Sequence, residues 1–400
     1  MTLEKVKKYL ISGGFLFNKK LAAALWFGLS FIAVLITVTK GGVNNFEVYR
    51  HVYIHTIQKV NLYLFYPAEY QDVNLYGPVF GILIAPFALL PVKIGAFLWE
   101  MCNVAFLYFA IYKLPVNIKW RTALIILCAH EMMNTASWLQ NNAIVCGCLM
   151  LGYTYVVQKK EAAALFFILL PTFIKLYGVV GLAFIFFSDR PVKFIVWALV
   201  WSLIFFFLPL LITDIKFLVQ SYFDWYAGLQ VKADKNIRLD THYFYQDISI
   251  MGLIRRNLYP QLNDKIVLIV GMLAMASQFI YYRYFTNTAF RLYMLSSLLI
   301  FVVIFSTGSE SPTYIIALPG ICLWYFLQPS TKPGLWFFVF GYVLTTFSYS
   351  DIFTPWFREH IVKPYSLKAL PACVVWVIIF IQVHRKQFLR ARKLVYSDII

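Results

Sequence analysis

The sequence predicts an all-α protein: a polytopic bundle of about twelve transmembrane helices, with amphipathic surface helices in two long outer loops. Three observations support this fold class: an extreme apolar composition, long uninterrupted hydrophobic runs, and charges sorted by position along the chain. Hydrophobic residues make up 61% of the sequence and charged residues only 13%. Soluble domains are about half apolar and about a quarter charged. A water-soluble fold of this length could not bury so much apolar surface.

The hydrophobic runs are the second observation, and several reach the length of a membrane span. A run at residues 77–91 has two readings, a further span or a half-buried re-entrant helix; if it spans, residues 161–188 form one broken helix. The expected spans are 21–39, 94–112, 122–137, 138–157, 161–174, 175–188, 191–213, 266–283, 292–306, 312–328, 334–348 and 367–384.

The distribution of charge sets the expected topology. The chain has 35 Lys and Arg against 18 Asp and Glu. Most basic residues lie in short segments between spans and near both ends, so the positive-inside rule predicts cytoplasmic termini. Because the basic residues are dispersed among hydrophobic spans, a nucleic-acid partner is not expected. We expect residues 1–400 to form a single integral domain, multi-pass in the plasma (bacterial inner) membrane.

Two long loops stand out on the predicted outer side, at about residues 40–77 and 214–265. Connections in compact domains are usually about half a dozen residues long, so long loops call for a functional explanation. In the first long loop, apolar positions recur at helical spacing, and the second is again aromatic and amphipathic. Both loops are therefore expected to contain amphipathic helices lying on the membrane surface.

The first long loop also contains candidate catalytic carboxylates. Glu47 lies beside Arg50 soon after the first span, and Asp72 lies four residues before Tyr76 at the return to the membrane. Transfer of a sugar from a lipid phosphate needs a carboxylate to accept a proton, a cation to stabilise the leaving phosphate, and polar groups to orient the sugar. A solvated surface charge remains the simpler interpretation of either carboxylate taken alone.

Further polar residues lie within or beside spans and in the second long loop. Intramembrane ionisable groups are costly, so they are functional candidates by default, although a snorkelling lysine, headgroup-anchoring arginines or a helix cap would also explain them. Together with Arg50 and Tyr76 of the first long loop, the candidates for substrate binding are Gln140, Asn142, Lys175, His242, Arg255, Arg256 and Glu310.

No Walker motif, Gly-rich dinucleotide turn or HExxH sequence occurs, which leaves ATPase, redox and zinc-protease chemistry without support. No cofactor and no metal site are expected. Membrane lipid is an expected partner.

Taken in order, the motifs resemble glycosyltransferase family 87, a polytopic family of the GT-C class that includes polyprenol-phosphate-mannose-dependent mannosyltransferases. The resemblance covers most of the chain. It rests on the order and spacing of several short sequence segments. These are NNFEVYR, NLYGPVFGILIAPFALLP, LWEMCN, LQNNA, FIKLYG, YFDWYAGLQ, DISIMGLIRR and SESPTYIIALP.

The resemblance implies a GT-C fold, an extracytoplasmic active site and an inverting, metal-independent hexosyl transfer. The implied partners are a polyprenyl-phosphate sugar donor and a glycolipid or glycan acceptor. The family's catalytic Asp would fall at Asn45, and an amide cannot act as a general base. Glu47 or Asp72 then serves as the base, with Asn45 orienting the acceptor, or the chain is a catalytically silent lipid-glycan binding homologue. A transporter or lipid flippase is the alternative from another class, because Lys175 lies among short spans that fit a broken helix.

Overall fold

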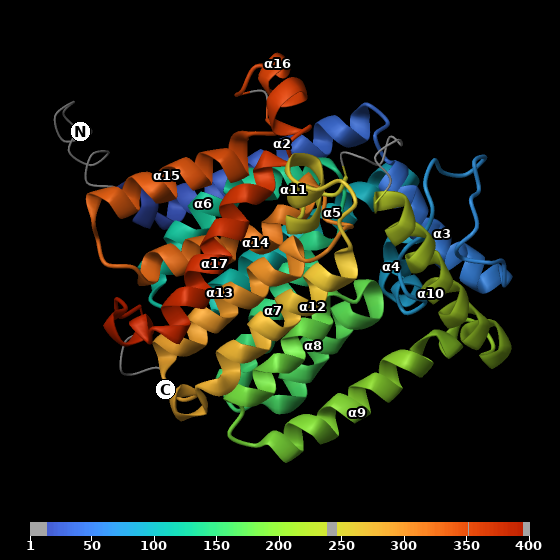
Figure 1. The fold of residues 1–400 in the computed structure, drawn as a ribbon. Helices are drawn as coiled ribbons and strands as arrows, with labels where there is room; N and C mark the ends of the chain where they lie inside the picture. Colours follow the sequence, from blue (N-terminus) through green and yellow to red (C-terminus); the bar gives the residue numbers. More distant parts are fainter. Residues whose placement is uncertain (1–13, 238–245, 351, 395–400) are drawn as a thin grey trace.

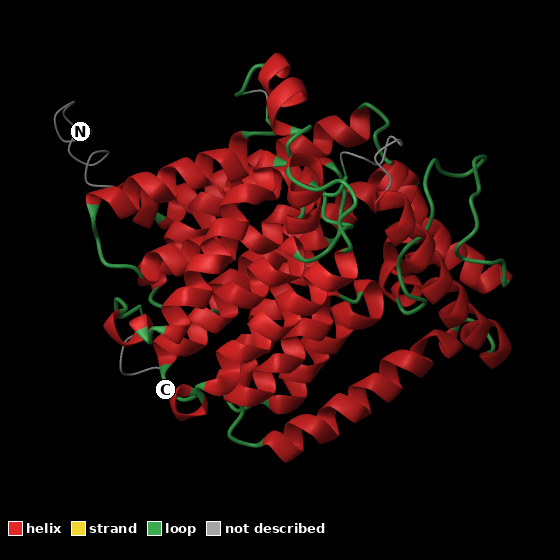
Figure 2. Cartoon of the chain, viewed as in Figure 1, coloured by secondary structure: helices red, strands yellow, loops and turns green. Residues whose placement is uncertain are grey.

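The computed structural model describes residues 14–237, 246–350 and 352–394. These residues form helices joined by turns and loops, and no strand occurs among them (Figures 1 and 2). The prediction of an all-α fold is confirmed. His242 lies outside the described residues.

The first half of the chain supplies the helices on which most candidate residues lie. The amphipathic helix predicted in the first long loop is present as α3, with Phe46 and Tyr49 buried. The helices of this half are α2 (Lys19–Thr39), α3 (Asn44–Gln58), α4 (Phe80–Ala88), α5 (Val92–Lys113), α6 (Ile118–Ser137), α7 (Asn142–Val157), α8 (Glu161–Lys175), the 3₁₀ segment η2 (Tyr177–Phe187) and α9 (Pro191–Phe207).

The second half begins with an amphipathic helix and then completes the bundle. The elements are α10 (Ile215–Ile237), α11 (Ile250–Asn257), α12 (Asp264–Ser277), α13 (Thr288–Ile304), the 3₁₀ turn η7 (Ser311–Thr313), α14 (Tyr314–Leu327), α15 (Lys332–Phe347), α16 (Pro355–Phe357), η9 (Leu367–Ala369) and α17 (Leu370–His384).

The core of the bundle is centred on α14. It packs against α6, α7, α13, α15 and α17, and nearly all of its side chains are buried. A helix that is apolar on every side must be enclosed on every side, which is what these neighbours provide. By contrast, α9 lies at the edge of the bundle (Figure 1) and packs mainly against α8. It leaves large apolar side chains such as Leu199 and Leu203 exposed.

Four helical segments among the described residues are long and apolar enough to cross a membrane. They are Lys19–Thr39, Val92–Lys113, Pro191–Leu211 and Leu367–His384, and shorter apolar helices lie at Asn142–Val157, Tyr177–Phe187, Thr288–Ile304 and Ser311–Leu327. The count of about twelve spans remains a prediction.

Two ambiguous regions take a definite form. The run at 77–91 contains α4, whose nine residues extend about 14 Å, roughly half of a bilayer core. This fits a short re-entrant helix rather than a span. Residues 161–188 are interrupted at Leu176, whose φ of 60° ends α8 and redirects the chain into η2. The break leaves Lys175 at the last position of α8.

Candidate functional site

Two cavities lie along the first long loop and meet at Asp72, and a third adjoins them at Glu310. The central cavity, of about 390 Å³, lies between this loop, the turn between α6 and α7, the end of α8, α10 and residues 306–313. The loop groove, of about 500 Å³, lies between residues 61–75 and α10, and the side cavity, of about 330 Å³, reaches Arg358 and Lys363. Asp72 lines both the loop groove and the central cavity, and Glu310 lines both the central and the side cavity.

The central cavity brings together half of the twelve residues expected at the site, although they are far apart in sequence. Its lining combines three residues of the first long loop with three from the bundle: Asn45, Asp72, Tyr76, Gln140, Lys175 and Glu310. Carboxylates, amides, a phenol and an amine therefore share one space, which is a suitable set for binding a sugar phosphate.

Local hydrogen bonds hold Asp72 in place at the mouth of this cavity. The backbone N–H of Val73 donates to Asp72 Oδ1 at 2.8 Å, and that of Gln71 donates to Asn44 Oδ1 at 2.7 Å. A few residues later, the N–H of Gly77 donates to the carbonyl of Ile174 at 2.9 Å. The segment that carries Asp72 is thus fastened both to the start of α3 and to the end of α8.

Asn45 faces the same cavity from the first turn of α3. Its Nδ2 donates to the backbone carbonyl of Trp138 at 2.7 Å, which joins α3 to the turn between α6 and α7. An amide in this position can orient a hydroxyl group, but it cannot accept a proton.

Glu47, two residues further along α3, lies elsewhere. Its carboxylate is 3.7 Å from both Arg50 Nη1 and His51 Nδ1, and it lines none of the three cavities. Arg50 donates through Nε to the carbonyl of Ala88 at 3.1 Å, so it packs against the end of α4. The structure separates these two residues from the cavity-lining set.

A series of hydrogen-bonded side chains runs along one wall of the central cavity. Lys175 Nζ donates to Asn142 Oδ1 at 2.9 Å, and Asn142 Nδ2 donates to Gln140 Oε1 at 2.6 Å. Gln140 Nε2 then donates to Glu310 Oε2 at 3.0 Å. This series of hydrogen bonds links the start of α7 and the end of α8 to the start of η7. It holds the Lys175 amine at one end and the Glu310 carboxylate at the other.

Lys175 has aromatic and amide neighbours. Its Nζ lies 5.9 Å from the ring centre of Tyr76 and 5.1 Å from that of Tyr177, within cation–π range. Within the part of the chain that the structure describes, no carboxylate lies within ion-pair distance of this amine. A cation at a cavity wall without a carboxylate partner is well suited to bind an anion.

Tyr76 closes one wall of the cavity. Its hydroxyl lies 3.1 Å from that of Tyr49, and the two rings meet edge to face with centres 5.0 Å apart. Burial raises the pKa of Tyr76 well above its usual value, so the phenol stays protonated and remains a hydrogen-bond donor.

The two arginines of the second long loop do not line the cavities. Arg255 is buried and makes ion pairs with Asp247, at 2.6 Å, and with Asp264. Arg256 donates to the carbonyl of Lys363 at 3.0 Å. Both therefore anchor α11 to its neighbours in this structure.

A buried ion pair, which was not predicted from the sequence, lies next to the turn that follows Glu310. Lys368 Nζ lies 2.8 Å from Glu131 Oε1 and 2.9 Å from Ser311 Oγ, while Asn134 Nδ2 donates to the same two acceptors. Glu131 and Lys368 are both fully buried. The network ties η7, which follows Glu310 directly, to α6. The sequence signals for it were two charged residues inside predicted spans, Glu131 in 122–137 and Lys368 in 367–384.

Comparison with known proteins gives one match. The sequence model described as "Glycosyltransferase family 87" matches residues 74–307, more than half of the 400-residue chain. No curated protein and no solved structure matches the chain. The family match confirms the resemblance seen in the motifs.

Proposed function

Because this chain belongs to glycosyltransferase family 87 and is a membrane glycosyltransferase, we propose that it transfers a hexose, specifically mannose, from a polyprenyl-phosphate sugar. The acceptor is a glycolipid or a cell-envelope glycan, and the reaction inverts the anomeric centre. The site faces the extracytoplasmic side of the plasma membrane, with both termini in the cytoplasm. No nucleotide-activated sugar is available on that side, so a donor already attached to membrane lipid fits the location.

The single observation that supports this proposal most strongly is that Asp72 and Lys175 line the same cavity. In the proposed reaction, the acceptor hydroxyl oxygen attacks the anomeric carbon and its proton passes to the Asp72 carboxylate. The bond between that carbon and the phosphate oxygen breaks, and the electron pair leaves with the lipid phosphate. Lys175 stabilises the charge that develops on this leaving group.

We assign the base to Asp72 rather than to Glu47. A base must reach the acceptor hydroxyl directly or through one water molecule, and Glu47 lines none of the three cavities. Asn45, which occupies the position expected for the family's catalytic Asp, orients the acceptor.

The remaining cavity residues position the donor sugar. Gln140 and Glu310 offer an amide and a carboxylate to sugar hydroxyls, and Asn142 holds the Lys175 amine in place. Tyr76 donates a hydrogen bond from its protonated phenol. Arg50, His242, Arg255 and Arg256 have no part in this assignment.

The experiment that tests the function is sugar transfer by the purified chain in detergent, where no gradient exists to drive transport. A panel of radiolabelled polyprenyl-phosphate sugars is supplied with an extracted glycolipid fraction, and the product is digested with α- and β-specific glycosidases. Product from the mannose donor with an inverted anomeric configuration is expected. A retained configuration, or no transfer from any donor, would contradict the proposal and favour a silent homologue or a transporter.

Lys175→Gln tests the assignment of the phosphate site. Hydrogen bonds to charged groups contribute about 1.5–3 kcal/mol, so kcat/KM for the donor should fall about 10-fold to 100-fold. Lys59→Gln is the matched control, because Lys59 is exposed, pairs with Asp214 at 2.7 Å and lines none of the three cavities. An unchanged kcat/KM for the donor in Lys175→Gln would remove this lysine from the donor site.

A further inference from the structure

The loop groove meets the central cavity at the residue assigned as the base. The two spaces adjoin along the segment that carries this residue, because they share four lining residues: Asp72, Val73, Leu75 and Lys232. Lys175, which is assigned to the donor phosphate, lines the central cavity and does not line the groove. The groove is therefore a space from which a second substrate can reach Asp72 without displacing the donor.

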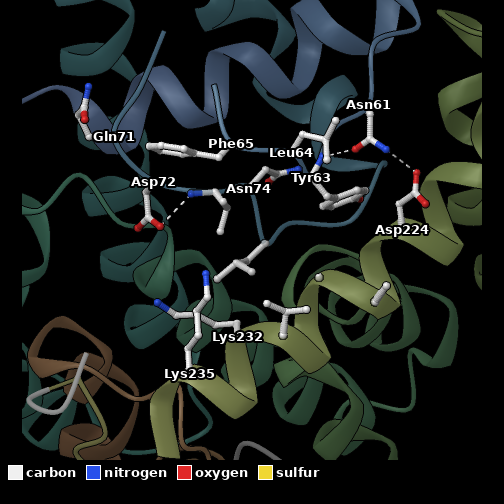
Figure 3. Close-up of a pocket in the computed structure, with 15 residues that line it drawn as sticks. Asn61, Tyr63, Leu64, Phe65, Gln71, Asp72, Asn74, Asp224, Lys232 and Lys235 are labelled. Atoms are coloured by element: carbon white, nitrogen blue, oxygen red, sulfur yellow. Dashed lines mark hydrogen bonds between the residues drawn. The ribbon is translucent and has the colours of Figure 1, made fainter. Parts of the chain in front are cut away.

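Hydrogen bonds between the two walls of the groove hold it in shape. One wall is the segment 61–75 and the other is α10 (Figure 3). Asn61 Nδ2 donates to Asp224 Oδ2 at 2.9 Å, and Trp225 Nε1 donates to the carbonyl of Leu75 at 2.9 Å. The groove is thus formed before a ligand arrives, which reduces the ordering cost of binding.

The groove is longer than one sugar residue. Lys232 lies at its junction with the central cavity, whereas Asp224 lines the groove alone. These two residues are eight positions apart on α10, which corresponds to about 12 Å along the helix axis. The volume of about 500 Å³ is also that of a typical small-molecule site. A ligand that fills the groove and still reaches Asp72 is therefore an extended molecule and not a single hexose.

The lining carries the groups that bind carbohydrate. Amides and carboxylates form hydrogen bonds with sugar hydroxyls, and an exposed aromatic ring can pack on the apolar face of a sugar. Phe65 is such a ring, since it lines the groove and is 54% exposed. The polar lining residues of these types are Asn61, Gln71, Asp72, Asn74 and Asp224.

The charged side chains of the groove balance one another. The lining has two carboxylates and two amines: Asp72, Asp224, Lys232 and Lys235. Asp234 lies between the two lysines on α10 and adds a further negative charge close by. Donors and acceptors are thus both present without an excess of positive charge. This combination matches hydroxyl groups, which donate and accept, better than it matches an anionic group.

We propose that the loop groove binds the acceptor, and that this acceptor is an uncharged glycan longer than one sugar residue, with Phe65 packing against one of its sugars. The proposal rests on the function proposed above, because it places the acceptor on one side of Asp72 and the donor phosphate, with Lys175, on the other. The terminal hydroxyl lies at the junction of the two spaces. The sugars that precede it extend along α10 toward Asp224.

The test measures binding without catalysis. The full chain is placed in nanodiscs of phosphatidylcholine, which carries no net charge. It is titrated calorimetrically with soluble, uncharged oligosaccharides of mannose, glucose and galactose, from the monosaccharide to the tetrasaccharide. In at least one series the affinity should rise about tenfold with length, because the longer members contact more of the groove. No binding in any series, or affinities that do not depend on length, would overturn the proposal.

A second measurement tests whether the preferred glycan is uncharged. Raising the salt concentration from about 50 mM to about 500 mM should change the affinity of the best oligosaccharide less than about twofold, since screening acts on charged ligands. The same oligosaccharide with one uronic acid in place of a hexose should bind no more tightly than the uncharged form. Tighter binding of the uronic acid form would refute an uncharged acceptor.

Variants assign the binding to the groove. Gly228 lines it, and a Cβ added there would meet its nearest atom, in Tyr63, at 3.8 Å, so Gly228→Leu fills part of the groove without a clash at Cβ. This variant should weaken binding of the best oligosaccharide more than about tenfold at an unchanged melting temperature. Unchanged affinity in a folded Gly228→Leu protein would place the glycan elsewhere.

Phe65→Ala tests the packing of the ring on a sugar. The affinity should fall about threefold to tenfold, the range expected for loss of one aromatic contact. Phe223→Ala is the matched control, because Phe223 is 68% exposed on α10 and lines none of the three cavities. Equal affinities in the Phe65→Ala and Phe223→Ala proteins would refute the role of Phe65.

The outcome separates this inference from the proposed function. Length-dependent binding that Gly228→Leu removes, with no sugar transfer from any donor, would support the groove as a glycan site and refute the enzymatic role. Sugar transfer with an acceptor KM that Gly228→Leu leaves unchanged would support the enzyme and refute the inference.

Discussion

Asp72→Asn is the substitution that tests the proposed mechanism most directly. It removes the proton acceptor while retaining a side-chain oxygen in the position that accepts the hydrogen bond from the N–H of Val73 at 2.8 Å. Replacing a charged acceptor by a neutral one in this bond costs about 1 kcal/mol of folding stability. Loss of a general base typically lowers the rate about 10²-fold to 10⁴-fold, and a 10³-fold loss corresponds to about 4 kcal/mol in the activation barrier.

The rate should therefore fall far more than the stability. The assay is the initial rate of transfer from radiolabelled polyprenyl-phosphate mannose in membranes, compared at equal expression, with the melting temperature of each purified protein as the check on folding. Glu47→Gln is the matched control, and because the charged partners of Glu47 lie 3.7 Å away, its rate should change less than about threefold. A silent Glu47→Gln beside an active Asp72→Asn would refute the assignment of the base.

Three further predictions concern stability and are checked by thermal unfolding in detergent. Gly77→Ala should destabilise the protein by about 3 kcal/mol, because the added Cβ would lie 2.1 Å from a backbone carbonyl oxygen, whereas Gly228→Ala, with its nearest atom at 3.8 Å, should not. Lys368→Met should cost about 3–5 kcal/mol by leaving the buried Glu131 without its partner, and removing both charges together should restore most of that loss; a fully additive double variant would contradict the pairing. Burial lowers the pKa of His55, so the stability it confers is present above the unfolded-state pKa of about 6.5 and is lost as the pH falls below it. His55→Gln should make the melting temperature less sensitive to acid than in the wild type, and an identical pH profile would exclude this cause.

The sequence predicted the fold class and the chemical character of the site better than it predicted which residues make up the site. Apolar composition and helical spacing indicated an all-α bundle and the amphipathic helix in the first long loop, and both are present. Lys175 was recognisable because an amine that interrupts an apolar run needs a cavity or a partner. It has both, in the central cavity and in Asn142.

The exclusion of Glu47 as the base depended on which side of α3 faces the central cavity. Asn45 and Glu47 differ by about 200° around the axis of this helix, so they face nearly opposite directions. Asn45 reaches the central cavity and Glu47 does not. The sequence predicted the helix, but its orientation is set by contacts with distant residues such as Trp138.

Contacts between distant parts of the chain were beyond prediction for a different reason. Lys368 and Glu131 are separated by 237 residues, and the loop groove forms only where residues 61–75 meet α10. No local pattern in one sequence specifies such pairs.

The hydrogen bond between the N–H of Gly77 and the carbonyl of Ile174 has a consequence for how this family can vary. It fixes the last residues of the first long loop to the helical turn that ends in Lys175. The distance between Asp72 and Lys175 is therefore set by this backbone contact and not by the length of the loop. Residues 60–71 can then lengthen or shorten to suit different acceptors while the reacting groups keep their separation. The short stretch from Asp72 to Gly77 has no such freedom, and insertions there should be far rarer than insertions a few residues earlier.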